Sequence, residues 1–325
     1  MAILIDPPAW PAHGTLWSHL VSDSGYDELH AFAKRLSVPR RGFDLDHYDV
    51  PASLHDRAIA LGALPVTARD VVFALRNAGL RVRQAEREAV TPLRRRQFLS
   101  AEWANLGDLV GTGAARSAQH DWLALGETLI ARWNEAHRSY HDERHLEDVL
   151  LALDQLATRG ERVSADTLLA AWFHDAVYTG TGDDELASAE LATSTLAQLP
   201  LDAALVSRVG EFIVATTPAR EVRDPATPLA HLLDADLSIF AAAPHRYQQY
   251  SESVRLEYAH VPEPDFASGR SRILSTYLEQ PAIYRTGTAQ QLWEQRARRN
   301  VELEIERLLG GTAGAAQLGP TAPTR

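Results

Sequence analysis

In the stretch Leu168-Leu-Ala-Ala-Trp-Phe-His-Asp-Ala-Val-Tyr178, an apolar segment of helical character runs directly into a His-Asp pair. An imidazole or a carboxylate in a core costs free energy unless a partner satisfies it. A divalent metal ion is one partner that would satisfy both His174 and Asp175. The alternative is that His174 hydrogen-bonds its neighbour at a helix end, which is the better explanation of an isolated His-Asp pair. The choice therefore depends on what the rest of the chain contributes.

Two further apolar segments bring His or Asp residues toward a core. His141 and His145 are four residues apart and share a face if both are helical, and the apolar stripe over 146–156 places His145 beside the buried side. Asp234 and Asp236 lie in a third helical segment, flanked by Leu and Ile. Several unpaired buried polar groups would be costly, so the three segments together favour a shared metal ion.

Composition limits the chemistry. The chain has 325 residues, 45% of them hydrophobic, and no cysteine, which excludes disulfides, thiolate zinc sites and a cysteine nucleophile. Any metal must then be held by His, Asp or Glu. The net charge of −11 argues against a general nucleic-acid surface. The N-terminus has no signal-peptide pattern and no segment is long and apolar enough to span a membrane, so we expect a soluble, cytoplasmic protein.

Two domains are expected. Residues 1–83 alternate short apolar strands with helices, which predicts a small α/β domain, and residues 84–116 form a linker or transition. Residues 117–309 show helical periodicity almost throughout and predict an all-α domain, followed by a disordered tail over 310–325. In the first domain we expect strands at 2–5, 43–50, near Val66 and at 80–82, and helices at 27–36, 53–61 and 68–77.

The first domain carries its own group of carboxylates and imidazoles. Hard oxygen ligands together with His suit several divalent ions, so this group is a candidate metal site. Equally, the carboxylates can cap turns while His47 packs, and the sequence does not choose. The domain resembles a family of small domains of uncharacterised function, through Trp17-Ser-His-Leu20, Glu28-Leu-His30 and Asp46-His-Tyr-Asp49, and this resemblance implies no activity. The candidate residues are Asp6, His19, Asp46, His47 and Asp49.

In the second domain, His145, then His174-Asp175, then Asp236 resembles the His…His-Asp…Asp signature of the HD superfamily of metal-dependent phosphohydrolases. The resemblance covers about 122–309. It implies that these four residues hold one divalent ion. The local words that match a subgroup of predicted HD phosphohydrolases are Tyr140-His-Asp-Glu-Arg-His145 (with Asp142 where Asn is usual), Trp172–Tyr178, Asp184-Glu-Leu-Ala-Ser-Ala189, Arg255-Leu-Glu-Tyr258, Gly269-Arg270 and Ala297-Arg-Arg-Asn300.

The expected mechanism follows from the chemistry of such an ion, which lowers the pKa of a water molecule and polarises a phosphoryl group. Asp175 would also orient the water, and His141 is a candidate proton donor to the leaving oxygen, although a supporting or surface role for His141 is nearly as plausible. Imidazole ligands favour Mn, Fe, Ni, Co or Zn over Mg. Ala215-Thr216 is not followed by the His common in the subgroup, which weakens the case for a second ion there. Candidate phosphate-binding residues are Arg144, Arg255, Arg270 and Arg298.

Three functional hypotheses remain. The leading one is a metal-dependent phosphohydrolase acting on a small phosphorylated metabolite or nucleotide. The second is a nucleotide-binding regulatory protein that has the metal site but little turnover. The third makes the Asp/His group of the first domain the catalytic site. No motif reads a base or a sugar, and the sequence leaves the oligomeric state open.

Overall fold

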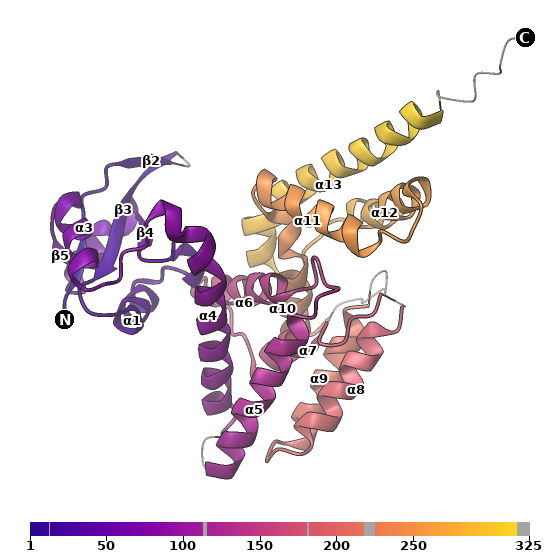
Figure 1. Ribbon diagram of the computed structural model, residues 1–325, viewed down its shortest axis with the longest axis horizontal. Helices are drawn as coiled ribbons and strands as arrows, with labels where there is room; N and C mark the ends of the chain where they lie inside the picture. The colour runs from indigo at the N-terminus through magenta and orange to yellow at the C-terminus, as the bar shows by residue number, and fades with distance from the viewer. Residues whose placement is uncertain (13, 113–115, 181, 218–224, 317–325) are drawn as a thin grey trace, which may run out of the picture. The chain divides into compact units, whose positions relative to one another are not determined.

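The computed structural model describes the whole chain except residues 13, 113–115, 181, 218–224 and 317–325. It divides into two compact units. We call Met1–Phe98 together with Asp154–Glu161 the small domain, and Leu99–Leu153 together with the residues from Arg162 onward the helical domain. Figure 1 shows strands only in the first part of the chain and helices throughout the rest.

The small domain is built on a mixed sheet whose central strand is β3 (Figure 1). β3 pairs antiparallel with β1, β2 and β4, and β5 joins β1 in parallel. The strands are β1 (Ile3–Ile5), β2 (Trp10–Ala12), β3 (Thr15–Ser22), β4 (Tyr48–Pro51) and β5 (Leu64–Pro65).

Helices cover both faces of this sheet. Adjacent residues of β3 point to opposite faces, and Leu20 packs in a core with α1 and α2, whereas Val21 packs with Val71 and Leu75 of α3. The N-cap of α3 is Thr67, in a reciprocal capping box with Asp70. The helices are α1 (Tyr26–Leu36), α2 (Ala52–Ala60) and α3 (Ala68–Asn77), with a 3₁₀ turn η1 (Arg40–Gly42).

The expectation of a small α/β domain is confirmed, but three strands were predicted wrongly: β2 and β3 were not expected, and a strand was expected at 80–82. The central strand β3 was missed because its polar and aromatic residues, among them Trp17 and His19, obscure the apolar alternation of a strand. They are half-buried residues of a paired strand. The strand expected at 80–82 is absent: Leu80 and Arg81 donate their backbone N–H groups to Leu75 O and close the end of α3 instead.

Beyond residue 83 the described residues form helices and connecting turns without strands, as expected. The helices are η2 (Gln84–Glu86), α4 (Arg87–Leu109), α5 (Arg116–Trp133), α6 (Glu143–Thr158), α7 (Ala165–Phe173), α8 (Asp184–Leu196), α9 (Ala203–Ala215), α10 (Thr227–Asp236), η4 (Leu237–Ala241), α11 (Pro244–Glu257), α12 (Glu263–Leu278) and α13 (Gly287–Ala316).

Two segments are more helical than expected. Much of the predicted linker, 84–116, belongs to the long helix α4. Helix α13 continues to Ala316, past the expected start of a disordered tail at 310. The remainder of that tail, 317–325, lies outside the described residues, as do residues 113–115 of the predicted linker.

Tryptophans form the part of the helical core that supports α7. Trp103 of α4 and Trp122 of α5 stack with ring centroids 4.1 Å apart, and each indole N–H donates to the backbone carbonyl of the other residue, at 2.7 and 2.8 Å. Trp103 also meets Trp172 edge to face at 5.0 Å, and Trp133 donates its indole N–H to Trp172 O. These contacts fix the helix end that leads into His174.

Candidate metal centre

Four side chains from three helical segments converge in the helical domain. His145 lies on α6, His174 and Asp175 directly follow α7, and Asp236 is the last residue of α10. The Nε2 atoms of His145 and His174 are 3.1 Å apart. His145 Nε2 lies 3.2 Å from Asp236 Oδ1 and 3.6 Å from Asp175 Oδ2, and His174 Nε2 lies 3.6 and 3.2 Å from the same oxygens.

These separations fit the donor set of a transition-metal ion. Donor atoms held ~2.1 Å from one ion lie roughly 3.0–3.4 Å from their neighbours in octahedral or tetrahedral coordination. One ligand atom from each of His145, His174 and Asp236 lies within 4.8 Å of the other two, and Asp175 adds a second carboxylate beside both imidazoles. Two imidazoles and two carboxylates suit Mn, Fe, Ni, Co or Zn better than Mg.

Hydrogen bonds orient both imidazoles toward this point. His174 Nδ1 lies 2.9 Å from the backbone oxygen of Ala171. Because a carbonyl only accepts, Nδ1 carries a hydrogen, and Nε2 is the nitrogen left to bind a metal once its proton is displaced. His145 Nδ1 lies 3.0 Å from the hydroxyl of Tyr140, and this contact holds the ring with Nε2 facing Nε2 of His174.

The electrostatics of the group favour a cation. Burial opposes the ionisation of Asp175 and Asp236, but His174 and His145 beside them hold the pKa of both carboxyls below its ordinary value. Burial likewise opposes a charge on His174, and the neighbouring carboxylates outweigh it and raise the pKa of that imidazole. Both carboxylates are therefore ionised at neutral pH, and a divalent ion would replace the imidazole proton as their counter-charge.

His141 lies in the turn that precedes α6, so it is not on a helical face with His145 as the spacing suggested. Its Nδ1 lies 2.7 Å from Glu257 Oε2, and the ring stacks on Tyr178 at 4.3 Å. Burial opposes a charge on His141, but the hydrogen bond to Glu257 and the charge of Asp175 outweigh it, so the pKa is raised. The pKa of Glu257 is correspondingly held at about 2, despite burial, by its bonds to His141 and the backbone.

Glu257 organises this turn, a role that sequence reasoning missed. Its Oε1 accepts the backbone N–H groups of Ser139, Tyr140 and His141 at 2.8, 2.7 and 3.0 Å. The residue belongs to the word Arg255-Leu-Glu-Tyr258, which was noted only as a resemblance. A carboxylate more than a hundred residues from the turn gives no local signal for such contacts.

Arg138 is a second organising residue that the sequence did not reveal. Its guanidinium is buried and donates to the backbone oxygens of His141, Asp175 and Ala176, at 2.8, 2.7 and 3.2 Å. It thereby links the turn before α6 to the end of α7. The chain contains so many arginines that this one carried no distinguishing pattern.

The residues after α7 are braced by the start of α8. Asp184 accepts the N–H groups of Thr179 and Gly180, at 3.0 and 2.7 Å, and Ser188 hydrogen-bonds the backbone N–H of Val177. Burial and the charge of Asp175 raise the pKa of Glu185.

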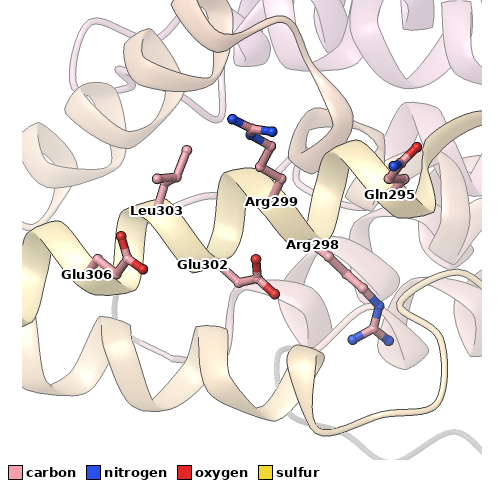
Figure 2. Close-up of a pocket in the computed structure, with 6 residues that line it drawn as sticks. All are labelled: Gln295, Arg298, Arg299, Glu302, Leu303 and Glu306. Atoms are coloured by element: carbon pink, nitrogen blue, oxygen red, sulfur yellow. The ribbon is translucent and has the colours of Figure 1, made fainter.

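Each arginine proposed to bind phosphate has an internal partner. Arg144 pairs with Asp142, Arg255 with Glu263, Arg270 with Glu304 and Arg298 with Glu294. Arg298 also lines a pocket along α13, and Figure 2 shows its side chain pointing to a different side of the helix from Arg299. None of the six residues lining that pocket belongs to the metal-ligand group.

A second cavity adjoins the metal-ligand group, because Asp236 lines it. Its volume is about 230 Å³. Arg285 also lines it, and the Nη1 atom of this guanidinium is buried without a hydrogen-bond partner among the described residues. Arg285 was not predicted as a site residue. The polar residues sharing the wall are Thr216, Thr217, Thr276, Tyr277 and Gln280.

Asp234, considered beside Asp236 in the sequence, has a different function. It accepts the backbone N–H groups of Arg285 and Thr286 at 2.7 and 2.8 Å and the Thr286 hydroxyl at 2.8 Å. It therefore holds the segment that carries Arg285, while Asp236 faces the two imidazoles. His231 is fully buried in α10.

The candidate residues of the small domain also come together. One ligand atom from each of His19, His47 and Asp49 lies within 4.8 Å of the other two. Asp6 and Asp46 lie behind the imidazoles: Asp6 Oδ2 is 2.8 Å from His19 Nδ1, and Asp46 Oδ1 is 2.6 Å from His47 Nδ1. The five residues predicted from sequence thus form one connected group.

Comparison with known proteins adds a family match within the small domain. Residues 3–78 match a family model described as a protein of unknown function, DUF4031, in agreement with the resemblance of residues 1–83 to an uncharacterised family. No curated protein matches the chain. Among the described residues, no helix is long and apolar enough to cross a membrane.

Proposed function

We propose that the helical domain is an HD-type, metal-dependent phosphohydrolase that cleaves a phosphate ester of a small metabolite or nucleotide. The observation that carries the proposal is the convergence of His145, His174, Asp175 and Asp236 at separations suited to one ion. When bound, a divalent ion supplies an activated water molecule and polarises a phosphoryl oxygen. The cavity beside Asp236 favours a small substrate, since its volume of about 230 Å³ is modest for a ligand pocket.

Asp175 and His141 divide the proton transfers in this proposal. Asp175 uses Oδ2 toward the imidazoles, which leaves its Oδ1 to accept a hydrogen bond from the attacking water and orient it. His141 holds its proton more tightly than a free imidazole because Glu257 accepts from Nδ1–H, and its Nε2–H can protonate the leaving oxygen. The His141 side chain is partly exposed, which allows a leaving group to reach it.

Arg285 replaces the sequence-predicted arginines as the phosphoryl-binding residue. The other four arginines are engaged by carboxylates within the fold. Arg285 lines the same cavity as Asp236 and has an unsatisfied donor in Nη1. Because Nη1 is itself shielded, a phosphoryl oxygen in the cavity would take its charge-assisted hydrogen bond from the remaining N–H groups of this guanidinium.

The test is elemental analysis of the purified chain beside an Asp175→Ala variant, with both assayed on a generic phosphomonoester and a panel of nucleotides. Asp265→Ala is the matched control, because Asp265 is an exposed carboxylate on α12 of the same domain. We expect Asp175→Ala to lose metal from the helical domain together with at least 100-fold of turnover, and Asp265→Ala to retain both.

The outcomes separate the hypotheses. A helical domain that stays metal-free after reconstitution with Mn, Fe, Ni, Co and Zn would overturn the proposal. Metal bound with no turnover on the whole panel would favour the nucleotide-binding regulatory protein. Activity that survives Asp175→Ala but is abolished by His47→Ala would place catalysis in the small domain.

A further inference from the structure

Strand pairing places the His/Asp group of the small domain on one face of the sheet. His19 on β3 and Asp49 on β4 are directly opposed in the antiparallel ladder, so their side chains leave the same face of the sheet. His47 precedes Asp49 by two residues, and its ring lies 5.0 Å from that of His19. His47 Nε2 is 3.6 Å from Asp49 Oδ1.

Each imidazole is fixed by a carboxylate that is itself buried. Asp6 and Asp46 are each 1% exposed. Asp6 accepts the His19 backbone N–H through Oδ1 at 2.5 Å and contacts His19 Nδ1 through Oδ2. Asp46 contacts His47 Nδ1 through Oδ1 and accepts from Arg81 Nη1 and Val82 N through Oδ2, at 2.8 and 2.7 Å.

This arrangement leaves the Nε2 atoms as the available ligands. A carboxylate that accepts Nδ1–H sets the tautomer, orients the ring and makes Nε2 more basic. Metal-bound histidines commonly have such a carboxylate behind them. An accidental surface cluster has no need of two buried carboxylates, one behind each ring. Burying Asp6 and Asp46 is costly unless they are well bonded, and each of them uses one carboxylate oxygen to hold a histidine ring.

The group is also open to solvent. The side chains of His19, His47 and Asp49 are 26%, 15% and 47% exposed. Structural zinc sites are closed by four protein ligands, whereas sites that bind water or a substrate keep a position free. Three protein ligands on an accessible sheet face belong to the second kind.

We propose that His19, His47 and Asp49 bind a second divalent transition-metal ion, with Asp6 and Asp46 positioning the two histidines and one side left for water or an anionic ligand. The N₂O donor set suits Zn, Co, Ni, Fe or Mn. The site is independent of the phosphohydrolase proposed for the helical domain, and every residue that builds it lies in the small domain.

The test counts zinc on the full-length chain after equilibrium dialysis, using variants that empty each site separately. We expect two ions per chain in the wild type, one in His174→Ala, one in His47→Ala and none in the double variant. The matched control, His174→Ala with His55→Ala, should keep one ion, because His55 has the same 15% side-chain exposure but lies outside the group.

A second measurement guards against misfolding. Asp49 is half exposed, so Asp49→Asn should leave the far-UV circular dichroism unchanged and weaken zinc binding to the small domain by at least 100-fold. Asp6→Asn should weaken it by roughly 10–100-fold, the usual effect of losing such a carboxylate. Both are measured in the His174→Ala background, by competition with a chromophoric chelator.

The two proposals fail in different ways. If His174→Ala binds no zinc while the wild type binds one ion, the small-domain site is refuted and the helical site stands. Suppose that the wild type binds one ion, which persists in His174→Ala and disappears in His47→Ala. The small-domain site then stands, and the phosphohydrolase proposal is refuted because the helical domain binds no metal. Zinc binding that is unchanged by Asp49→Asn and Asp6→Asn would also overturn the small-domain site.

Discussion

At the scale of single residues, Glu257 bonds both to the backbone of the turn before α6 and to His141, the candidate proton donor of the proposed active site. It accepts three backbone N–H groups of the turn and holds Nδ1 of His141. Tyr178 donates its hydroxyl to the same carboxylate at 3.0 Å. One side chain therefore sets both the position and the protonation of the candidate proton donor.

Glu257→Gln should shift the alkaline limb of the pH profile of kcat/KM to lower pH. The carboxylate stabilises the protonated form of His141, so its removal lowers the imidazole pKa, and the proton needed for the leaving oxygen is lost at a lower pH. A hydrogen bond to a charged group contributes about 1.5–3 kcal/mol, so the expected shift is roughly 1–2 pH units. The pH profile is measured on an alkyl phosphomonoester, because its leaving alkoxide must be protonated as it departs.

The amide oxygen of the introduced glutamine can still accept backbone N–H bonds, so the fold should be retained, which a thermal melt checks. His141→Gln should remove the alkaline limb altogether. If the limb stays where it is in both variants, His141 is not the proton donor and serves only the structure of the turn.

Arg285 supports a separate prediction about binding. Arg285→Met should raise KM for phosphate esters by roughly 10–100-fold, since it removes a charge-assisted hydrogen bond to the phosphoryl group. The matched control is Arg298→Met, which removes a guanidinium that is already paired with Glu294. Steady-state kinetics of both variants show which arginine binds the phosphoryl group. A large rise in KM for Arg298→Met alone would mean that Arg298, the arginine predicted from sequence, binds it instead of Arg285.

At the scale of elements, the approach of α4 to α5 depends on two glycines. Gly107 lies against the ring of Trp122, and Gly126 lies against the ring of Trp103. A Cβ at either position would overlap the indole, and the two indoles are in turn fixed by their reciprocal hydrogen bonds. The helices can therefore pack this closely only because these positions lack a side chain.

Gly126→Ala should lower the free energy of unfolding by about 1–3 kcal/mol, the usual cost of overpacking a core. The control is Gly269→Ala in α12, where an added Cβ meets nothing within 4 Å. There the same substitution should raise the free energy of unfolding by about 0.4–1 kcal/mol, because alanine restricts the unfolded chain. Urea unfolding measures both; equal effects of one sign would contradict the packing argument.

The elements also show which parts of the fold and of the candidate sites local sequence patterns can predict. Helices such as α1, α3, α6 and α7 were predicted to within a few residues because their apolar periodicity and end signals are local. The central strand β3 was not, because its half-buried polar residues face a site and break the expected alternation. Among site residues, His174 and Asp236 stood out as polar groups within apolar runs. Arg285 and Glu257 acquire their roles only through contacts made across the fold, which no local pattern encodes.

At the scale of the whole molecule, metal binding should appear as stability of the helical domain. The four ligands bring buried charges together, and an ion bound to the folded state alone stabilises it by about 2.7 kcal/mol at a concentration of 100 times Kd. For a domain of this size we expect Tm to rise by roughly 5–10 °C on adding Mn²⁺ or Zn²⁺ to chelator-treated protein. Differential scanning calorimetry measures the shift.

Asp236→Ala should abolish that rise for the transition of the helical domain. The same variant should leave any shift of the small-domain transition in place, since the two ligand groups share no residue. A rise in Tm of equal size in Asp236→Ala and in the wild type would mean that the ion stabilises the helical domain from another position.

The tryptophan that supports α7 gives the molecule an internal optical reporter. The ring of Trp133 lies 5.5 Å from that of His174 and 6.1 Å from that of His145. An indole this close to a paramagnetic ion loses its excited state by energy transfer, whereas a closed-shell ion leaves the emission intact. The ring of Trp10 lies 5.2 Å from that of His19 in the other proposed site, so the measurement is made on the His47→Ala variant. In that variant cobalt or nickel bound between His145 and His174 should quench the emission of Trp133 and zinc should not, so loading of this centre can be followed by fluorescence without a label.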